Sequence, residues 1–341
     1  MVQSKKSCVD ITAFSEYRSI LMVSAALSIF LMHIICSGIY TFGSALDKMI
    51  VLWGSSGVDI FFFLSGMGIY CSLDNSHKNC GGGHWYRNRL LKVMIPYILI
   101  IIPFSILNKD SFAISVSRIS TLYFWIFQND GCWFVSFIIL MYLASPLMYR
   151  VIKTDEGRPS SRTVWVLLTC VCIALLVFEW AAEDLFLRLS IGISRIPSFI
   201  VGMMIGSNLK RRLTGIPLGL LPLLVIVSIV EFLLDVNEMS FIILTLKSCR
   251  SLLILSLEAM LITTVSAKVK GFFQGKAIAS LGSITLEFYL IHLLILNLIR
   301  SYNITVLNDR ILMVGLFLAA TIIMSYGVHI ISKRLLRFLQ V

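Results

Sequence analysis

Long apolar runs alternate with short polar segments along nearly the whole chain. A membrane-spanning helix needs about 20 mostly apolar residues, and ten runs approach that length. Spans are predicted at residues 19–40, 50–73, 91–107, 132–151, 164–182, 190–208, 217–234, 249–267, 278–299 and 311–332. Segment 108–131 carries Arg118 inside an apolar stretch, which favours an interfacial or re-entrant piece over a further span. The pattern predicts an all-α polytopic membrane bundle of about ten helices.

The distribution of basic residues predicts how this bundle is oriented in the membrane. With the N-terminus in the cytoplasm, 20 of the 29 Lys and Arg residues fall in cytoplasmic segments, as the positive-inside rule requires. Both termini are then cytoplasmic, which predicts a tail at 1–18, a membrane domain at 19–332 and a second tail at 333–341. No loop exceeds about 24 residues, against roughly 50 for an independent domain, so we expect the helices themselves to carry the function.

Composition excludes several classes of protein. Apolar residues make up 58% of the chain and charged residues 14%, whereas soluble domains have about 45–50% and about 25%. The net charge of +11 would suggest nucleic acid in a soluble protein, but here the surplus belongs to cytoplasmic loops, and no nucleic acid is expected. The eight cysteines show no metal-binding spacing, so neither a metal site nor a disulfide framework is predicted.

Four ionisable residues are predicted at one depth, about 8–13 Å from the outer ends of their spans: His33, Asp59, Arg195 and His292. Such groups are rare inside spans and tend to face a cavity or a partner. We predict His33 as a general base oriented by Asp59, because a carboxylate fixes the imidazole tautomer and raises its basicity. Two alternatives stay open: a plain interhelical hydrogen bond for His292, and a counter-ion role for Arg195 beside Asp59 or Glu231.

Other polar groups receive simpler interpretations. Glu179 and His329 lie near helix ends and are predicted to be structural.

Arg87, Arg89 and Lys92 stand at the start of the third span, and Arg89 and Lys92 share a helix face. Three cations at a membrane entrance suit a phosphorylated ligand. Binding of lipid headgroups is the alternative.

Several runs of residues resemble one family when they are taken together in order. They are RSILMVSAALSIFLMH at 18–33, GVDIFFFLSG at 57–66, YRNRLLKVMIPY at 86–97, WFVSFIILMYLASPL at 133–147, RIPSFIVGMMIG at 195–206 and LGSITLEFYLIH at 281–292. In that order and at comparable spacing they resemble the acyltransferase 3 family of bacterial integral-membrane acyltransferases. The resemblance implies a ten-helix enzyme of the inner membrane that moves an acyl group, usually acetyl from acetyl-CoA, to a carbohydrate hydroxyl.

The resemblance also implies roles for particular residues. The family's paired Arg and His match Arg18 and His33, but fourteen residues intervene here, a separation of about 22 Å along a helix. Arg18 is therefore assigned to the CoA phosphates. The family's Arg-x-x-Arg matches Arg89 and Lys92, and the lysine loses bidentate phosphate recognition. Residues assigned to the acceptor pocket or the oxyanion are Trp133, Arg195, Glu287, Tyr289 and His292.

The sequence thus predicts a membrane O-acetyltransferase in which His33 acts as general base or carries the acetyl group as a relay. Its co-substrate is acetyl-CoA, no permanently bound cofactor is expected, and the acceptor is a surface glycan or a lipid-linked oligosaccharide. Membrane lipids are its surroundings. A proton-coupled transporter or flippase for lipid-linked sugars is the main alternative, because the same intramembrane acids and histidines would serve as a proton relay. A catalytically silent family member acting as a sensor or assembly factor is a third.

Overall fold

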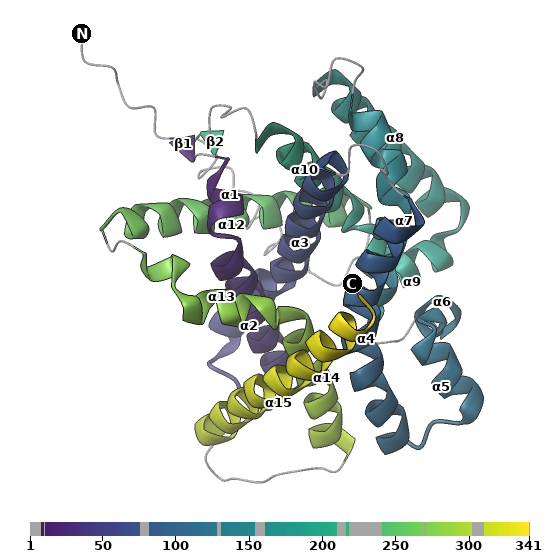
Figure 1. Cartoon of the computed structure of the whole chain (residues 1–341), viewed down its shortest axis with the longest axis vertical. Coiled ribbons are helices and arrows are strands. Elements are labelled where there is room, and N and C mark those ends of the chain that lie inside the picture. Colours follow the sequence, from purple (N-terminus) through teal and green to yellow (C-terminus); the bar gives the residue numbers. More distant parts are fainter. Residues whose placement is uncertain are drawn as a thin grey trace. The chain divides into compact units, whose positions relative to one another are not determined.

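A computed structural model describes residues 8–9, 11–75, 82–127, 131–153, 161–209, 216–217, 241–268, 271–301 and 310–340. The main helices are α2 (Arg18–Cys36), α3 (Ser44–Asn75), α4 (Gly83–Leu107), α7 (Trp133–Ile152), α8 (Ser161–Ala181), α10 (Ile196–Asn208), α12 (Phe241–Lys268), α14 (Thr285–Ser301) and α15 (Arg310–Phe338). Shorter helices are α1 (Ala13–Glu16), α5 (Phe112–Ile119), α6 (Leu122–Phe127), α9 (Glu183–Ile193), α13 (Lys276–Ser283) and the 3-10 turn η3 (Phe272–Gln274). Figure 1 shows their course.

The all-α membrane architecture is confirmed. Seven helices in the described part of the chain are long and apolar enough to cross a membrane, or eight when α13 and α14, bent by 58°, count as one broken span. The predicted span at 217–234 lies outside the described residues. A two-residue pairing of β1 (Cys8–Val9) with β2 (Ile216–Pro217) is antiparallel.

Local sequence explains where several helices begin and end. The hydroxyl of Ser111 caps α5 by accepting a hydrogen bond from the backbone N–H of Ile114 at 3.4 Å. Pro197 stands in the first turn of α10, where its missing N–H costs no hydrogen bond. The described part of the predicted interfacial segment, residues 108–127, contains the two short helices α5 and α6 and no span, which agrees with the prediction from Arg118. Helix α15 continues to Phe338, beyond the predicted end of its span at residue 332.

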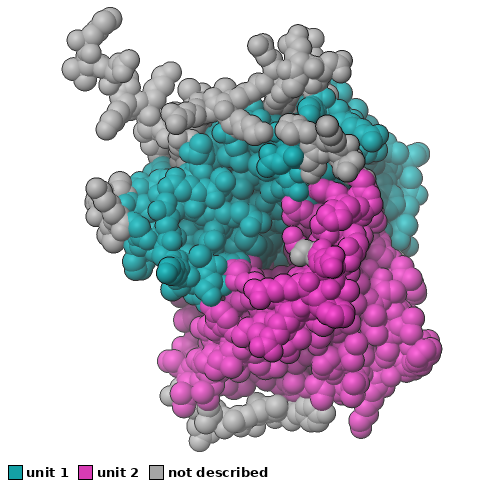
Figure 2. Space-filling model, viewed as in Figure 1, with its two compact units in different colours: residues 1–25, 56–77, 145–282 teal, residues 26–55, 78–144, 283–341 magenta. Residues whose placement is uncertain are grey.

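The helices sort into two compact units that interleave along the chain, coloured separately in Figure 2. Unit 1 comprises residues 1–25, 56–77 and 145–282. Glycines allow close helix packing inside it. A Cβ built on Gly202 of α10 would lie 2.0 Å from the carbonyl oxygen of Phe63, and one on Gly66 of α3 would lie 2.2 Å from that of Phe199. The backbones of α3 and α10 therefore touch through small residues, as membrane helices commonly do.

This contact predicts that Gly202→Ala destabilises the protein. The new methyl group meets backbone that cannot rotate away, and overpacking of this kind costs about 1–3 kcal/mol or more. We expect a lower melting temperature and less monodisperse protein after detergent extraction. Gly315→Ala on α15 is the matched control, because nothing lies within 4 Å of its added Cβ. Equal thermal stability of the two variants would contradict the packing argument.

Unit 2 comprises residues 26–55, 78–144 and 283–341. In it α14 contacts both α4 and α15, and α4 contacts α15 as well. The rings of Phe30, Phe288 and Phe317 meet in its core, with centroids 5.9 Å apart for Phe30–Phe288 and 4.8 Å for Phe30–Phe317. The second half of α2 is thereby fixed against α14 and α15. This packing positions the last turn of α2, where His33 lies.

Candidate active site

Two histidines from distant parts of the sequence meet in unit 2. Nδ1 of His33, in the last turn of α2, lies 2.8 Å from Nε2 of His292 on α14. The rings stack with centroids 5.1 Å apart. His292 is completely buried, whereas His33 is partly accessible. The pair therefore consists of one hidden imidazole and one that a ligand can reach.

The hydrogen bonds determine which nitrogens carry hydrogen. Nδ1 of His292 lies 3.0 Å from the backbone carbonyl oxygen of Phe288. A carbonyl only accepts, so Nδ1 of His292 is the donor. In the neutral ring Nε2 of His292 is then an acceptor, and His33 donates to it from Nδ1. This leaves the lone pair of His33 on Nε2, the nitrogen that a general base would use.

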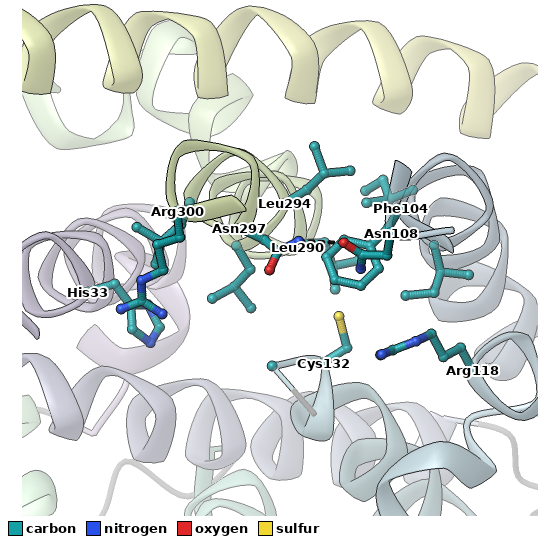
Figure 3. A pocket seen from close by; sticks show the side chains of 14 residues that line it. His33, Phe104, Asn108, Arg118, Cys132, Leu290, Leu294, Asn297 and Arg300 are labelled. Carbon is teal, nitrogen blue, oxygen red and sulfur yellow. Dashed lines mark hydrogen bonds between the residues drawn. The ribbon is translucent and has the colours of Figure 1, made fainter. Parts of the chain in front are cut away.

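A cavity of about 410 Å³ adjoins His33 within unit 2. Its volume falls within the usual range of about 300–1,000 Å³ for small-molecule sites. Its walls come from α2, α4, α5, α14 and the start of α7, and Figure 3 shows the side chains. The lining residues are His33, Ile100, Ile101, Phe104, Asn108, Arg118, Gly131, Cys132, Leu290, Leu293, Leu294, Leu296, Asn297 and Arg300.

The polar groups of the cavity are unevenly distributed. The guanidinium of Arg300 lies near enough to His33 to act on it electrostatically, and both stand at the same end of the view in Figure 3. At the other end Arg118 binds Asp110 at 2.9 Å and lies over the ring of Tyr123 at 3.8 Å. Asn297 donates to Asn108 at 2.7 Å. The cavity is thus lined by one imidazole, two guanidinium groups and an apolar wall.

Asp59 has other partners than the predicted one. Its carboxylate accepts hydrogen bonds from Arg195, from Ser198 at 2.8 Å and from Ser251 at 2.8 Å, all within unit 1. This corrects the expected orientation of His33 by Asp59: His292 is the partner of His33, and Asp59 is engaged by α10 and α12. Matching depth along two spans did not reveal which residues pair. The alternative of a counter-ion role for Arg195 beside Asp59 is confirmed, and Glu231 lies outside the described residues.

None of the other residues predicted for the acceptor pocket is among the side chains that line the cavity. The hydroxyl of Tyr289 donates to the carbonyl of Gly131, a lining residue, at 3.1 Å. Trp133 is buried directly after the lining residue Cys132. Glu287 accepts from His329 at 2.8 Å, and Arg195 belongs to the Asp59 cluster in unit 1. Tyr289 and Trp133 thus adjoin the cavity wall, and His292 holds the imidazole of His33.

The predicted phosphate-binding cations divide between the two units. Arg87, Arg89 and Lys92 lie on the first turns of α4 in unit 2, and Nη2 of Arg87 donates to the carbonyl of Leu339 at 2.6 Å. This bond brings the basic end of α15 to the start of α4. Arg18 begins α2 in unit 1, within 3.9 Å of a Cβ built on Gly68.

Sequence reasoning missed most of the cavity lining. Arg118 was used only to identify the interfacial segment, and Arg300, Asn108, Asn297 and Cys132 were not predicted to belong to a site. A weak signal was present, since Asn297 is an amide inside an apolar run only five residues after His292. In the part of the chain that the structure describes, no three His, Cys, Asp or Glu residues form a metal-binding group.

Comparison with known families decides the general class of the protein. A family model described as an acyltransferase domain matches residues 23–330, nearly the whole chain. The chain belongs to this acyltransferase family. No curated protein and no solved structure gives a significant match. The resemblance expected from the six sequence runs is thus confirmed, and the chain is a membrane acyltransferase built of apolar helices.

The histidine pair predicts the effect of a change at the buried partner. His292→Phe removes the acceptor for Nδ1 of His33, so the imidazole of His33 loses its fixed tautomer and orientation. By analogy with other residues that orient a reactive imidazole, the acyltransferase should lose about 10- to 100-fold in turnover, with less effect on KM. Steady-state kinetics on purified protein measure this. His292→Gln supplies a side-chain oxygen as acceptor and should recover part of the loss, and no recovery would count against positioning.

Proposed function

We propose that the protein is a membrane O-acetyltransferase that uses acetyl-CoA as donor and a surface glycan or its lipid-linked precursor as acceptor, in a bacterial inner membrane. The single observation that carries the proposal is the hydrogen bond from Nδ1 of His33 to the buried His292, which leaves Nε2 of His33 as a base beside a cavity. Membership of the acyltransferase family supplies the reaction class.

The reaction needs one proton acceptor and one stabilised oxyanion. The acceptor hydroxyl gives its proton to Nε2 of His33 while its oxygen attacks the thioester carbonyl. The C–S bond then breaks, and the proton passes from His33 to the departing thiolate. His33 lies in the last turn of α2, where the helix dipole favours the transient imidazolium. Arg300 is the cation nearest to this centre in the cavity lining, and we assign it to the negative charge that develops on the carbonyl oxygen.

The donor site is assigned to the basic start of α4. Arg89 and Lys92, three residues apart on one face of the helix, suit the phosphates of CoA. Arg87 is already held by the carbonyl of Leu339, so its role is to attach the end of α15 to this region. The apolar side chains that line the cavity, among them Leu290, Leu293 and Leu294, suit the acyl chain and the pantetheine arm.

Purified protein tests the proposal by turnover of acetyl-CoA. With acceptor glycan present, we expect release of free CoA and transfer of radiolabelled acetyl. Arg89→Glu should raise the KM for acetyl-CoA about tenfold or more, because a carboxylate replaces a cation at the phosphates. Arg150→Glu, an exposed arginine at the end of α7, is the control. Absence of acetyl-CoA binding and turnover in folded protein would favour the transporter alternative.

A further inference from the structure

Three polar side chains from consecutive helices form a second cluster in unit 2. Oγ of Ser283, the last residue of α13, lies 3.3 Å from Nε2 of His329 on α15. Nδ1 of the same imidazole lies 2.8 Å from Oε1 of Glu287 on α14. Ser283 is exposed, whereas the side chains of His329 and Glu287 are only 15% and 6% exposed. A reachable hydroxyl is thus backed by a nearly buried imidazole and carboxylate.

The hydrogen-bond partners of the two ring nitrogens determine the tautomer of His329. The ionised carboxylate of Glu287 only accepts, so His329 donates from Nδ1. Nε2 then presents its lone pair to the hydroxyl of Ser283. A hydroxyl, an imidazole and a carboxylate in this sequence are the components of an activated serine nucleophile, which is recognised by geometry and not by position in the sequence.

The backbone at Ser283 adds a second favourable feature. The chain turns by 58° between α13 and α14, directly after Ser283. The hydroxyl therefore stands at the start of the 17-residue helix α14, whose N-terminal dipole favours negative charge. An oxyanion formed next to Ser283 would gain from that field.

This cluster is distinct from the histidine pair. Glu287 and His292 are five residues apart on α14, which places them about 8 Å apart along the helix axis and about 140° apart around it. The two imidazoles, His329 and His33, also have different hydrogen-bond partners. Neither cluster needs the other for its chemistry.

We propose that Ser283, His329 and Glu287 form a serine-nucleophile site that accepts an acyl group from an activated ester or thioester. Oγ of Ser283 bonds to the carbonyl carbon and gives its proton to Nε2 of His329. The carbon–sulfur or carbon–oxygen bond to the leaving group breaks, and His329 returns the proton to the leaving group. Water then attacks the acyl-serine through the same imidazole, which releases the acid and restores the hydroxyl. Glu287 is a positioning residue for His329.

A fluorophosphonate probe tests this site in the full-length, detergent-purified protein. Peptide mass spectrometry should find the probe on Ser283, with none after Ser283→Ala. Ser280→Ala, one turn earlier on α13, should label like the wild type. His329→Gln should slow labelling by about 100-fold or more, because the general base is lost. Glu287→Gln should also slow it, and Glu287→Asp should restore part of the rate.

A second measurement separates this site from the proposed acetyltransferase. His33→Ala should label at Ser283 at the wild-type rate even though glycan acetylation is lost, and hydrolysis of p-nitrophenyl acetate should disappear with Ser283→Ala. Folded wild-type protein that leaves Ser283 unlabelled would overturn the proposal. Labelling that is unchanged by both His329→Gln and His329→Asn would also overturn it, and would identify the cluster as a hydrogen-bonded clamp between helices.

Discussion

Replacing His33 with alanine should reduce acetyl transfer by about 10²–10⁴-fold, the usual contribution of a positioned general base. The change removes the imidazole whose Nδ1 is bound to His292 and whose Nε2 remains for the acceptor proton. His33 lies at the end of α2 and is partly accessible, so the helix should still fold. Initial rates of acetyl transfer, normalised to folded protein from gel filtration, measure the effect.

His84→Gln is the matched control for this experiment, because His84 is an exposed histidine in the first turn of α4 and not in the cavity lining. It should retain wild-type rates. His33→Gln should be as defective as His33→Ala, since an amide cannot take up the proton. If His33→Ala transfers acetyl at a rate close to that of the wild type, His33 is not the base.

Replacing Asp59 with alanine should chiefly prevent folding. The carboxylate is fully buried and accepts bonds from Arg195, Ser198 and Ser251, and Arg250 lies close by with its Nε 3.2 Å from Ser56. Removing one member of a buried ion pair costs about 3–5 kcal/mol, because the remaining charge has no counter-ion. A mid-sized membrane protein with a stability of about 5–15 kcal/mol would lose much of its folded population.

Thermal melting and the yield of monodisperse protein report this effect directly. Asp184→Asn is the control, since Asp184 is an exposed carboxylate in the first turn of α9. The two roles considered for Asp59 give opposite results. Normal yield and melting temperature with lost activity would assign Asp59 to catalysis, whereas poor yield with proportionate loss of activity assigns it to the core of unit 1.

Hydropathy located most of the helices because the length of an apolar run is a local property. The runs at 19–40, 50–73 and 132–151 correspond to α2, α3 and α7. The same reasoning placed an interfacial piece at 108–131, where a single arginine breaks the apolar pattern and two short helices form. Family membership could also be predicted from the sequence, because short residue runs in a fixed order can be recognised without knowing how the helices pack.

The sequence did not show which polar side chains form hydrogen bonds with each other in the site. His33 and His292 are 259 positions apart, and equal depth in the membrane applied as well to Asp59 as to His292. Only the packing of α2 against α14 in unit 2 decides between them. Arg300 was missed for a related reason: a cation after a predicted span looks like any other loop charge until its helix is seen beside a cavity.

The order in which the chain is synthesised has a consequence for when activity appears. His33 emerges from the ribosome early, with the first long helix, but the helix that supplies His292 follows some 250 residues later. A nascent chain therefore carries the imidazole of His33 without its hydrogen-bond partner for most of translation. Only the late insertion of α14 completes the pair. Under the proposed role of His33, a chain truncated before α14 should therefore be inactive.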